Sequence, residues 1–109
     1  MDSLNVSIRP DGDTQHIDVL GEVDVSCASE LRDVIDEAFE AKPAHIELHM
    51  DEVSYIDSTG IGVLVAAAHR AREAQATLSL IKPQRNVARV LSLLGVDEEL
   101  NLQNRESEE

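Results

Sequence analysis

A short run of small and polar residues in the middle of the chain carries the side chains best suited to chemistry. The run reads DSTGIG over residues 57–62, and apolar residues at helical spacing follow it. A hydroxyl at a helix N-terminus, such as that of Ser58, projects outward and can enter a kinase active site. Phosphorylation would add about −1.5 to −2 charges and three strong hydrogen-bond acceptors. The positive end of the helix dipole can hold such a phosphate, so the fold need not break.

The same run can also serve only as a helix cap. Asp57 and Ser58 both have the side-chain oxygen that an N-cap position favours, and local chemistry leaves the two interpretations open. A phosphate on Ser58 would lie next to Asp57 and close in sequence to Asp51 and Glu52. The added charge would therefore change which partner surface can dock at this point.

Catalytic and metal-binding interpretations are weaker. A nucleophile elbow requires Gly-x-Ser-x-Gly, but the residue two before Ser58 is Ile56. A phosphate loop requires Lys-Ser or Lys-Thr after its glycines, and neither follows Gly62. His45 and His49 are four apart on an expected strand, a separation of roughly 13 Å, and no zinc-binding pattern is present. We therefore expect no catalytic residue, no metal and no cofactor.

Composition restricts the classes of partner. The net charge of −13 would repel a nucleic-acid duplex or an anionic membrane, whereas a basic protein partner would be attracted. The acidic composition can also serve only to keep the chain soluble. Cys27 is the single cysteine and is expected to be a packed, small apolar residue. No window approaches the roughly 18 apolar residues of a membrane span, and no secretory signal opens the chain, so a cytoplasmic location is expected.

Hydrophobic periodicity predicts strands that alternate with helices. Strands are expected at 4–8, 14–20, 45–50 and 78–81, with a turn at 10–13 and a loop at 51–56. One helix is expected from an N-cap at Ser26 to Lys42-Pro43, and a second from the 57–60 run to about Gln75. A third is expected over 87–94, with Gly95 as its C-cap. Its apolar stripe consists of Val87, Val90, Leu91 and Leu94.

This order predicts a single α/β domain over residues 1–109, with an acidic, disordered tail from about 103. The short turn implies an antiparallel N-terminal hairpin, and the later strands must pair in parallel through right-handed crossovers. The helices would then pack on a mixed sheet. Because binding loops gather at the carboxyl ends of parallel strands, Asp24 and Ser58 are expected to share one rim.

Two motifs give the chain a resemblance to the anti-sigma factor antagonists of bacteria, in the STAS domain family. Residues 21–24, GEVD, with Ala28, Leu31 and Arg32 after them, are similar to the family's first signature. Residues 57–64, DSTGIGVL, are similar to its second signature, which holds the phosphorylated serine. The resemblance extends over nearly the whole chain.

The resemblance implies a partner-switching cycle in transcription regulation and stress response. The unphosphorylated antagonist binds an anti-sigma factor that is also a serine kinase, which frees a sigma factor. The kinase then phosphorylates Ser58 and the phosphoprotein dissociates, until a metal-dependent serine phosphatase restores it. By position, Ser58 is the acceptor and Thr59 a possible second one. The expected partner-binding residues are Asp24, Asp57, Ser58, Thr59, Gly60 and Ile61.

Two other functions compete with this interpretation. A domain of the same fold can serve as a scaffold without a switch, in a lipid-transport or stress-signalling complex. A small-ligand or nucleotide sensor is the third hypothesis. Co-purification with a membrane transporter would favour the second, and calorimetry with ATP and GTP would test the third.

Overall fold

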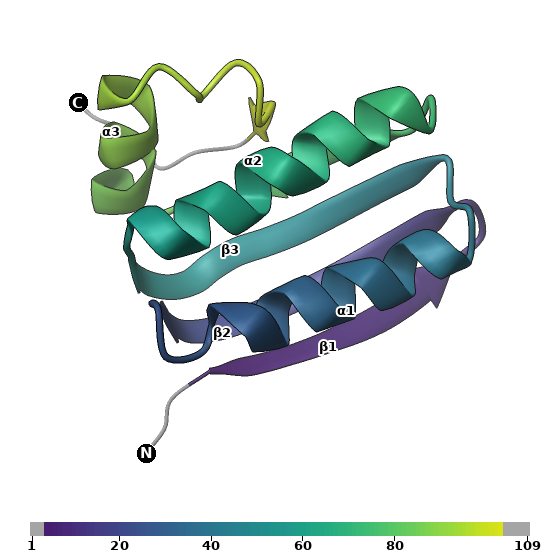
Figure 1. Ribbon diagram of the computed structural model, residues 1–109, viewed down its shortest axis with the longest axis horizontal. Coiled ribbons are helices and arrows are strands. Elements are labelled where there is room, and N and C mark those ends of the chain that lie inside the picture. The colour runs from purple at the N-terminus through teal and green to yellow at the C-terminus, as the bar shows by residue number, and fades with distance from the viewer. Residues whose placement is uncertain (1–3, 104–109) are drawn as a thin grey trace.

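Alternating apolar residues build an N-terminal hairpin from β1 (Asn5–Asp11) and β2 (Thr14–Val23), which pair antiparallel with Ile8 opposite Ile17. The structure is a computed structural model that describes residues 4–103 (Figure 1). The strands extend further than the sequence predicted: β1 includes Pro10 and Asp11, so the turn is confined to Gly12 and Asp13. Gly12 has φ +62°, which glycine adopts readily.

The third strand, β3 (His45–Ile56), is twice as long as predicted. The loop expected at 51–56 is wrong, because these residues continue the strand beside the end of β2. Register shifts interrupt the β2–β3 pairing between Asp18 and Leu20 and between Gly21 and Glu22. Such bulges break the alternation of inward and outward side chains, which is why residues 51–55, where Val53 is the single buried position, resemble a loop.

The sheet has the order β1-β2-β3-β4-β5 within the described residues, and all pairs after the hairpin are parallel. The predicted mixed sheet is therefore confirmed. Strand β4 (Thr77–Ile81) lies beside β3, and a short strand, β5 (Leu102–Gln103), closes the far edge. Sequence periodicity did not predict β5. The rest of the expected disordered tail, 104–109, lies outside the described residues.

Three helices are present in residues 4–103: α1 (Ala28–Glu40), α2 (Ser58–Glu73) and α3 (Arg85–Leu93). The predicted cap of α1 at Ser26 is wrong, since Cys27 is the N-cap residue and the Ser26 side chain bonds back to Asp24. Gly95 follows α3 with φ +76°, as a helix end favours. None of these helices is both long and apolar enough to span a bilayer.

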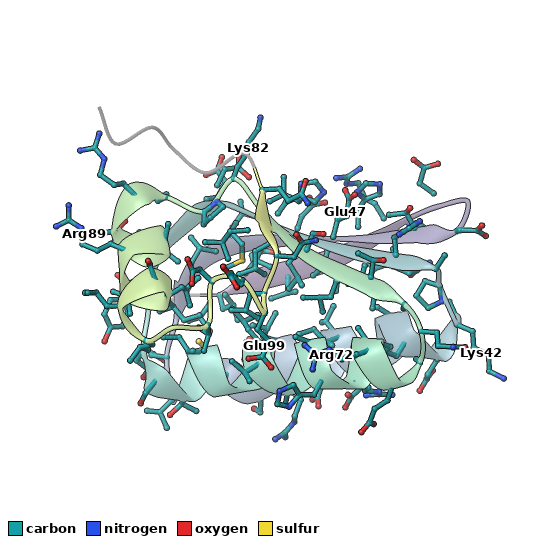
Figure 2. The ribbon with its side chains drawn as sticks, turned by 90° about the horizontal axis from the view of Figure 1, so that it is seen from above. Lys42, Glu47, Arg72, Lys82, Arg89 and Glu99 are labelled. Atoms are coloured by element: carbon teal, nitrogen blue, oxygen red, sulfur yellow. The ribbon has the colours of Figure 1, made fainter. Side chains whose placement is uncertain are left out.

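The core lies between one face of the sheet and the two longer helices. Figure 1 shows α1 and α2 side by side on that face, with α3 at one end of the molecule, and Figure 2 shows the two longer helices in one layer below the sheet. The fully buried side chains of this layer include Ile17, Val19, Leu31, Ile46, Leu48, Met50, Leu64 and Leu80. The predicted stripe of α3 is only partly buried: Val87 and Leu91 pack inward, but Leu94 is 57% exposed.

Candidate functional site

The carboxyl ends of β2 and β3 bring the two sequence motifs together. Val23 pairs with Ile56 at these ends, and the Asp57 N–H donates to the carbonyl of Val23 over 3.0 Å. The loop after β2 leads into α1, and β3 leads directly into α2, so both helices begin at the same end of the molecule (Figure 1). The predicted common rim for Asp24 and Ser58 is confirmed.

Asp57 ties the two halves of this rim together. It is the N-cap of α2, and its Oδ1 accepts a hydrogen bond of 3.0 Å from the Gly60 N–H. Its Oδ2 accepts a second bond of 3.0 Å from the N–H of Val25, in the loop before α1. One carboxylate thus satisfies backbone donors from two segments that are far apart in sequence, and fixes the first turn of α2 against the β2–α1 loop.

The next two residues point away from the core. Ser58 and Thr59 are exposed, in the first turn of α2, where a helix presents N–H groups and the positive end of its dipole. Gly60 and Ile61 are buried, with Ile61 only 6% exposed. Of the expected partner-binding residues, Ile61 therefore offers a partner almost no surface, and its side chain instead holds α2 on the sheet.

Gly60 allows α2 to begin this close to the strands. A Cβ at this position would lie 2.6 Å from Cγ1 of Val23 and 2.8 Å from Cγ1 of Ile56. Both distances are shorter than carbon atoms tolerate in contact, and both neighbours are buried side chains. The absence of a side chain at Gly60 thus sets how Ser58 is presented at the rim.

Asp24 uses its carboxylate to shape the loop between β2 and α1. Its Oδ1 accepts bonds from the Ser26 hydroxyl (2.6 Å) and the Ser26 N–H (3.0 Å). The hydrogen bonds from Ser26 hold the pKa of Asp24 below its ordinary value, so its charge persists at the rim. Cys27, expected to be packed and small, is indeed buried, and burial raises the pKa of its thiol.

Two exposed apolar side chains lie at this end of the sheet, and sequence reasoning missed them. Val25, whose N–H donates to Asp57, is 72% exposed. Tyr55, near the end of β3, is 49% exposed. Nearby, Asn86 in α3 donates to the carbonyl of Ser54, which fixes α3 against the same stretch of β3. Tyr55 follows Ser54 and precedes the buried Ile56, so its neighbours in sequence gave no clear signal of its exposure.

A groove of about 370 Å³ runs between α1 and α2 and begins at Thr59. Gly62 and Val63 line it from α2, and Arg32 lines it from α1. An ion pair of 2.6 Å between Arg70 and Asp36 crosses from one helix to the other. The rim therefore combines an exposed hydroxyl, exposed apolar groups and a groove with a cationic side chain, which suits recognition by another protein.

Comparison with known proteins defines the class. The family model of the STAS domain matches residues 6–109, and the chain belongs to this family. An anti-sigma-B factor antagonist from Listeria monocytogenes is 32% identical over 109 residues, covering 96% of this chain and 95% of that protein. The fold and the two motifs that carried the resemblance thus agree with an independent match over nearly the whole length.

Solved structures share the fold. An anti-sigma factor antagonist from Mycobacterium paratuberculosis superposes with a TM-score of 0.84 at 18% identity, over 94% of this chain and 86% of that one. The anti-sigma factor antagonist SpoIIAA in its unphosphorylated form gives a TM-score of 0.75 at 19% identity, over 97% and 90% of the two chains. At these identities the similarity establishes the architecture.

Proposed function

We propose that this protein is an anti-sigma factor antagonist: a single domain that acts in the cytoplasm and is switched by phosphorylation of Ser58. In its unphosphorylated form it binds an anti-sigma factor with serine-kinase activity and thereby releases a sigma factor. The name of the 32% identical Listeria relative supports the role. The observation that carries the site assignment is the exposed Ser58 at the start of α2, between the Asp57 cap and the buried Gly60.

The chemistry of the switch belongs to the partners. The kinase transfers the γ-phosphoryl group of ATP to the Ser58 hydroxyl oxygen, which leaves ADP and a proton, and a serine phosphatase reverses the modification with water. The new charge lies next in sequence to Asp57, at the same end of the sheet as the exposed apolar residues Val25 and Tyr55. A phosphate buried there against a partner without a matching cation would cost about 2–5 kcal/mol, a loss of about 30-fold or more in affinity.

The proposal is tested by capture and by phosphate mapping. Ser58→Ala, used as bait in a cell extract, should retain a soluble kinase and its associated partner, whereas Ser58→Asp should bind that kinase at least about 30-fold more weakly. Incubation of the wild type with the captured kinase and ATP should add one phosphate, located on Ser58 by mass spectrometry. Ser29→Ala is the matched control, because Ser29 is also exposed in the first turn of a helix, α1.

Three results would contradict the proposal. Phosphate found only on residues other than Ser58 would refute the site, and a phosphate on Thr59 alone would transfer the role to that residue. Equal kinase binding by Ser58→Ala and Ser58→Asp would refute the charge mechanism. Capture of a membrane transporter by both variants alike would favour a scaffold without a switch.

A further inference from the structure

The face of the sheet opposite α1 and α2 carries two histidines and a glutamate that the proposed function does not use. His16 in β2 is the register partner of Glu47 in β3, and His49 lies two residues beyond Glu47 on the same face. Figure 2 shows Glu47 on this open side of the sheet, away from the two helices. Among the described residues, these three form a group whose ligand atoms all lie within 4.8 Å of one another.

The distances suit one small cation. Nδ1 of His16 lies 2.9 Å from Nε2 of His49 and 3.5 Å from Oε1 of Glu47. Nε2 of His49 and Oε1 of Glu47 are 4.0 Å apart. In a tetrahedral zinc site with bonds of about 2.0–2.1 Å, ligand atoms lie about 3.4 Å from one another. The three observed separations bracket that value, so rotations of the side chains are enough to reach it.

The first histidine has a carboxylate close to its outer nitrogen, at ion-pair distance. Nε2 of His16, the nitrogen directed away from the cluster, lies 3.7 Å from the carboxylate of Asp11. A ligating imidazole commonly donates its second N–H to a carboxylate, which fixes the ring and strengthens the ligand. The His16 and His49 rings also stack, with centroids 5.1 Å apart, so both rings are held in place.

The surroundings favour a cation and leave it accessible. The His16 and His49 side chains are 17% and 24% exposed, so they are packed yet reachable from solvent. Arg9, the nearby cation on this face, is paired with Asp18 over 2.6 Å. That ion pair first, and the two histidines to a smaller degree, hold the pKa of Asp18 below its ordinary value.

We propose that His16, Glu47 and His49 bind a divalent transition-metal ion of the Zn²⁺ class, with water in the fourth position. Two imidazoles and one carboxylate are the mixed nitrogen and oxygen set that zinc accepts in open sites. The two imidazole nitrogens that face each other at 2.9 Å would both serve as ligand atoms, with the cation between them. This inference differs from the sequence-based expectation of no metal and does not depend on the proposed function.

Titration of the full-length, chelator-treated protein with ZnCl₂ tests the site. Calorimetry should show one equivalent bound at neutral pH, and binding should weaken in acid as protons compete for the imidazoles. His16→Ala and His49→Ala should each weaken binding by about 100-fold or more, and Asp11→Asn by about tenfold. His45→Ala should bind as the wild type does, because His45 is exposed on the same strand, β3, but outside the cluster.

Two further measurements keep the result independent of folding. Circular dichroism should show that each variant is folded, and ZnCl₂ should raise the melting temperature of the wild type and of His45→Ala but not of His16→Ala. Co²⁺ in place of Zn²⁺ should give the visible absorption of a tetrahedral complex only where both histidines remain. Binding of similar strength in the wild type, His16→Ala and His49→Ala would overturn the proposal, as would no binding by the wild type at about 1 mM Zn²⁺.

Discussion

At the scale of single residues, two neighbours in one motif have opposite orientations. The Asp57 carboxylate faces the protein and accepts from the backbones of Gly60 and Val25, whereas Ser58 is exposed to solvent. The sequence left both residues open as caps and predicted Ser58 as the phosphate acceptor. The structure assigns the cap to Asp57, which leaves the Ser58 hydroxyl available for modification.

Replacement of Asp57 should show how much its two hydrogen bonds contribute to stability. Asp57→Ala removes both acceptors and should lower the free energy of unfolding by about 1–2 kcal/mol, measured in urea. Asp57→Asn keeps one acceptor oxygen and should cost less. Amide exchange of Val25 and Gly60 should accelerate in the alanine variant.

A charge-matched variant controls for the loss of an acidic group. Asp33→Ala, at an exposed position of α1, should change stability by less than about 0.5 kcal/mol. If Asp57→Ala were no more costly than Asp33→Ala, the two bonds would not stabilise the rim.

At the scale of elements, the extension of β3 and the start of α2 depend on each other. After Met50, the buried residues along this extension are Val53 and Ile56, so buried positions follow at a spacing of three rather than two. Ile56 then packs against the backbone of Gly60, where α2 begins. The strand, the bulges and the close approach of the helix together define the position of Ser58.

The two glycines of the motif provide a test with an internal control. Gly60→Ala should destabilise the protein by about 1–3 kcal/mol, because its Cβ would force Val23 and Ile56 to move. Gly62→Ala should instead raise stability by up to about 1 kcal/mol, since a Cβ there meets nothing within 4 Å and alanine favours the helix.

Chemical denaturation of Gly60→Ala and Gly62→Ala measures this difference in stability. Equal stability of Gly60→Ala and Gly62→Ala would show that the start of α2 can shift away from the strands. Phosphorylation rates of the same variants would then show whether such a shift affects presentation of Ser58.

At the scale of the whole molecule, one face of the sheet is covered and the other is open. Helices α1 and α2 bury the first face, and the second carries the His16, Glu47 and His49 cluster (Figure 2). The proposed protein-binding rim lies at the end of the sheet where the helices begin (Figure 1). The two proposed sites therefore occupy separate surfaces, and each can be altered without the other.

The net charge of −13 should make stability depend on salt. At about 10 mM salt the Debye length of about 30 Å is comparable to the molecule's 35 × 32 × 21 Å extents, so acidic groups repel one another across the whole surface. Raising NaCl to about 200 mM at neutral pH should therefore increase the melting temperature by a few degrees.

The same titration near the isoelectric point of about 4.5 is the control. There the net charge vanishes and the salt dependence should largely disappear, while KCl at equal ionic strength should match NaCl at neutral pH. A melting temperature that falls with salt at neutral pH would mean that ion pairs such as Arg70–Asp36 outweigh the general repulsion.

The sequence by itself determined the class of fold and the location of the rim. Apolar periodicity and chain order specify a hairpin followed by parallel strands and helices, and parallel strands necessarily bring Asp24 and Ser58 to one edge. These features follow from local patterns and from the handedness of connections, which a single chain reveals.

Only the tertiary structure decided which residues meet across strands. The spacing along one strand excluded a shared metal ion for His45 and His49. It carried no information on the register between strands, which places His49 beside His16. The bulges that lengthen β3, the exposure of Tyr55 and the burial of Ile61 likewise depend on neighbouring strands. Register and bulges result from packing between distant segments, and so they appear only when the chain is folded.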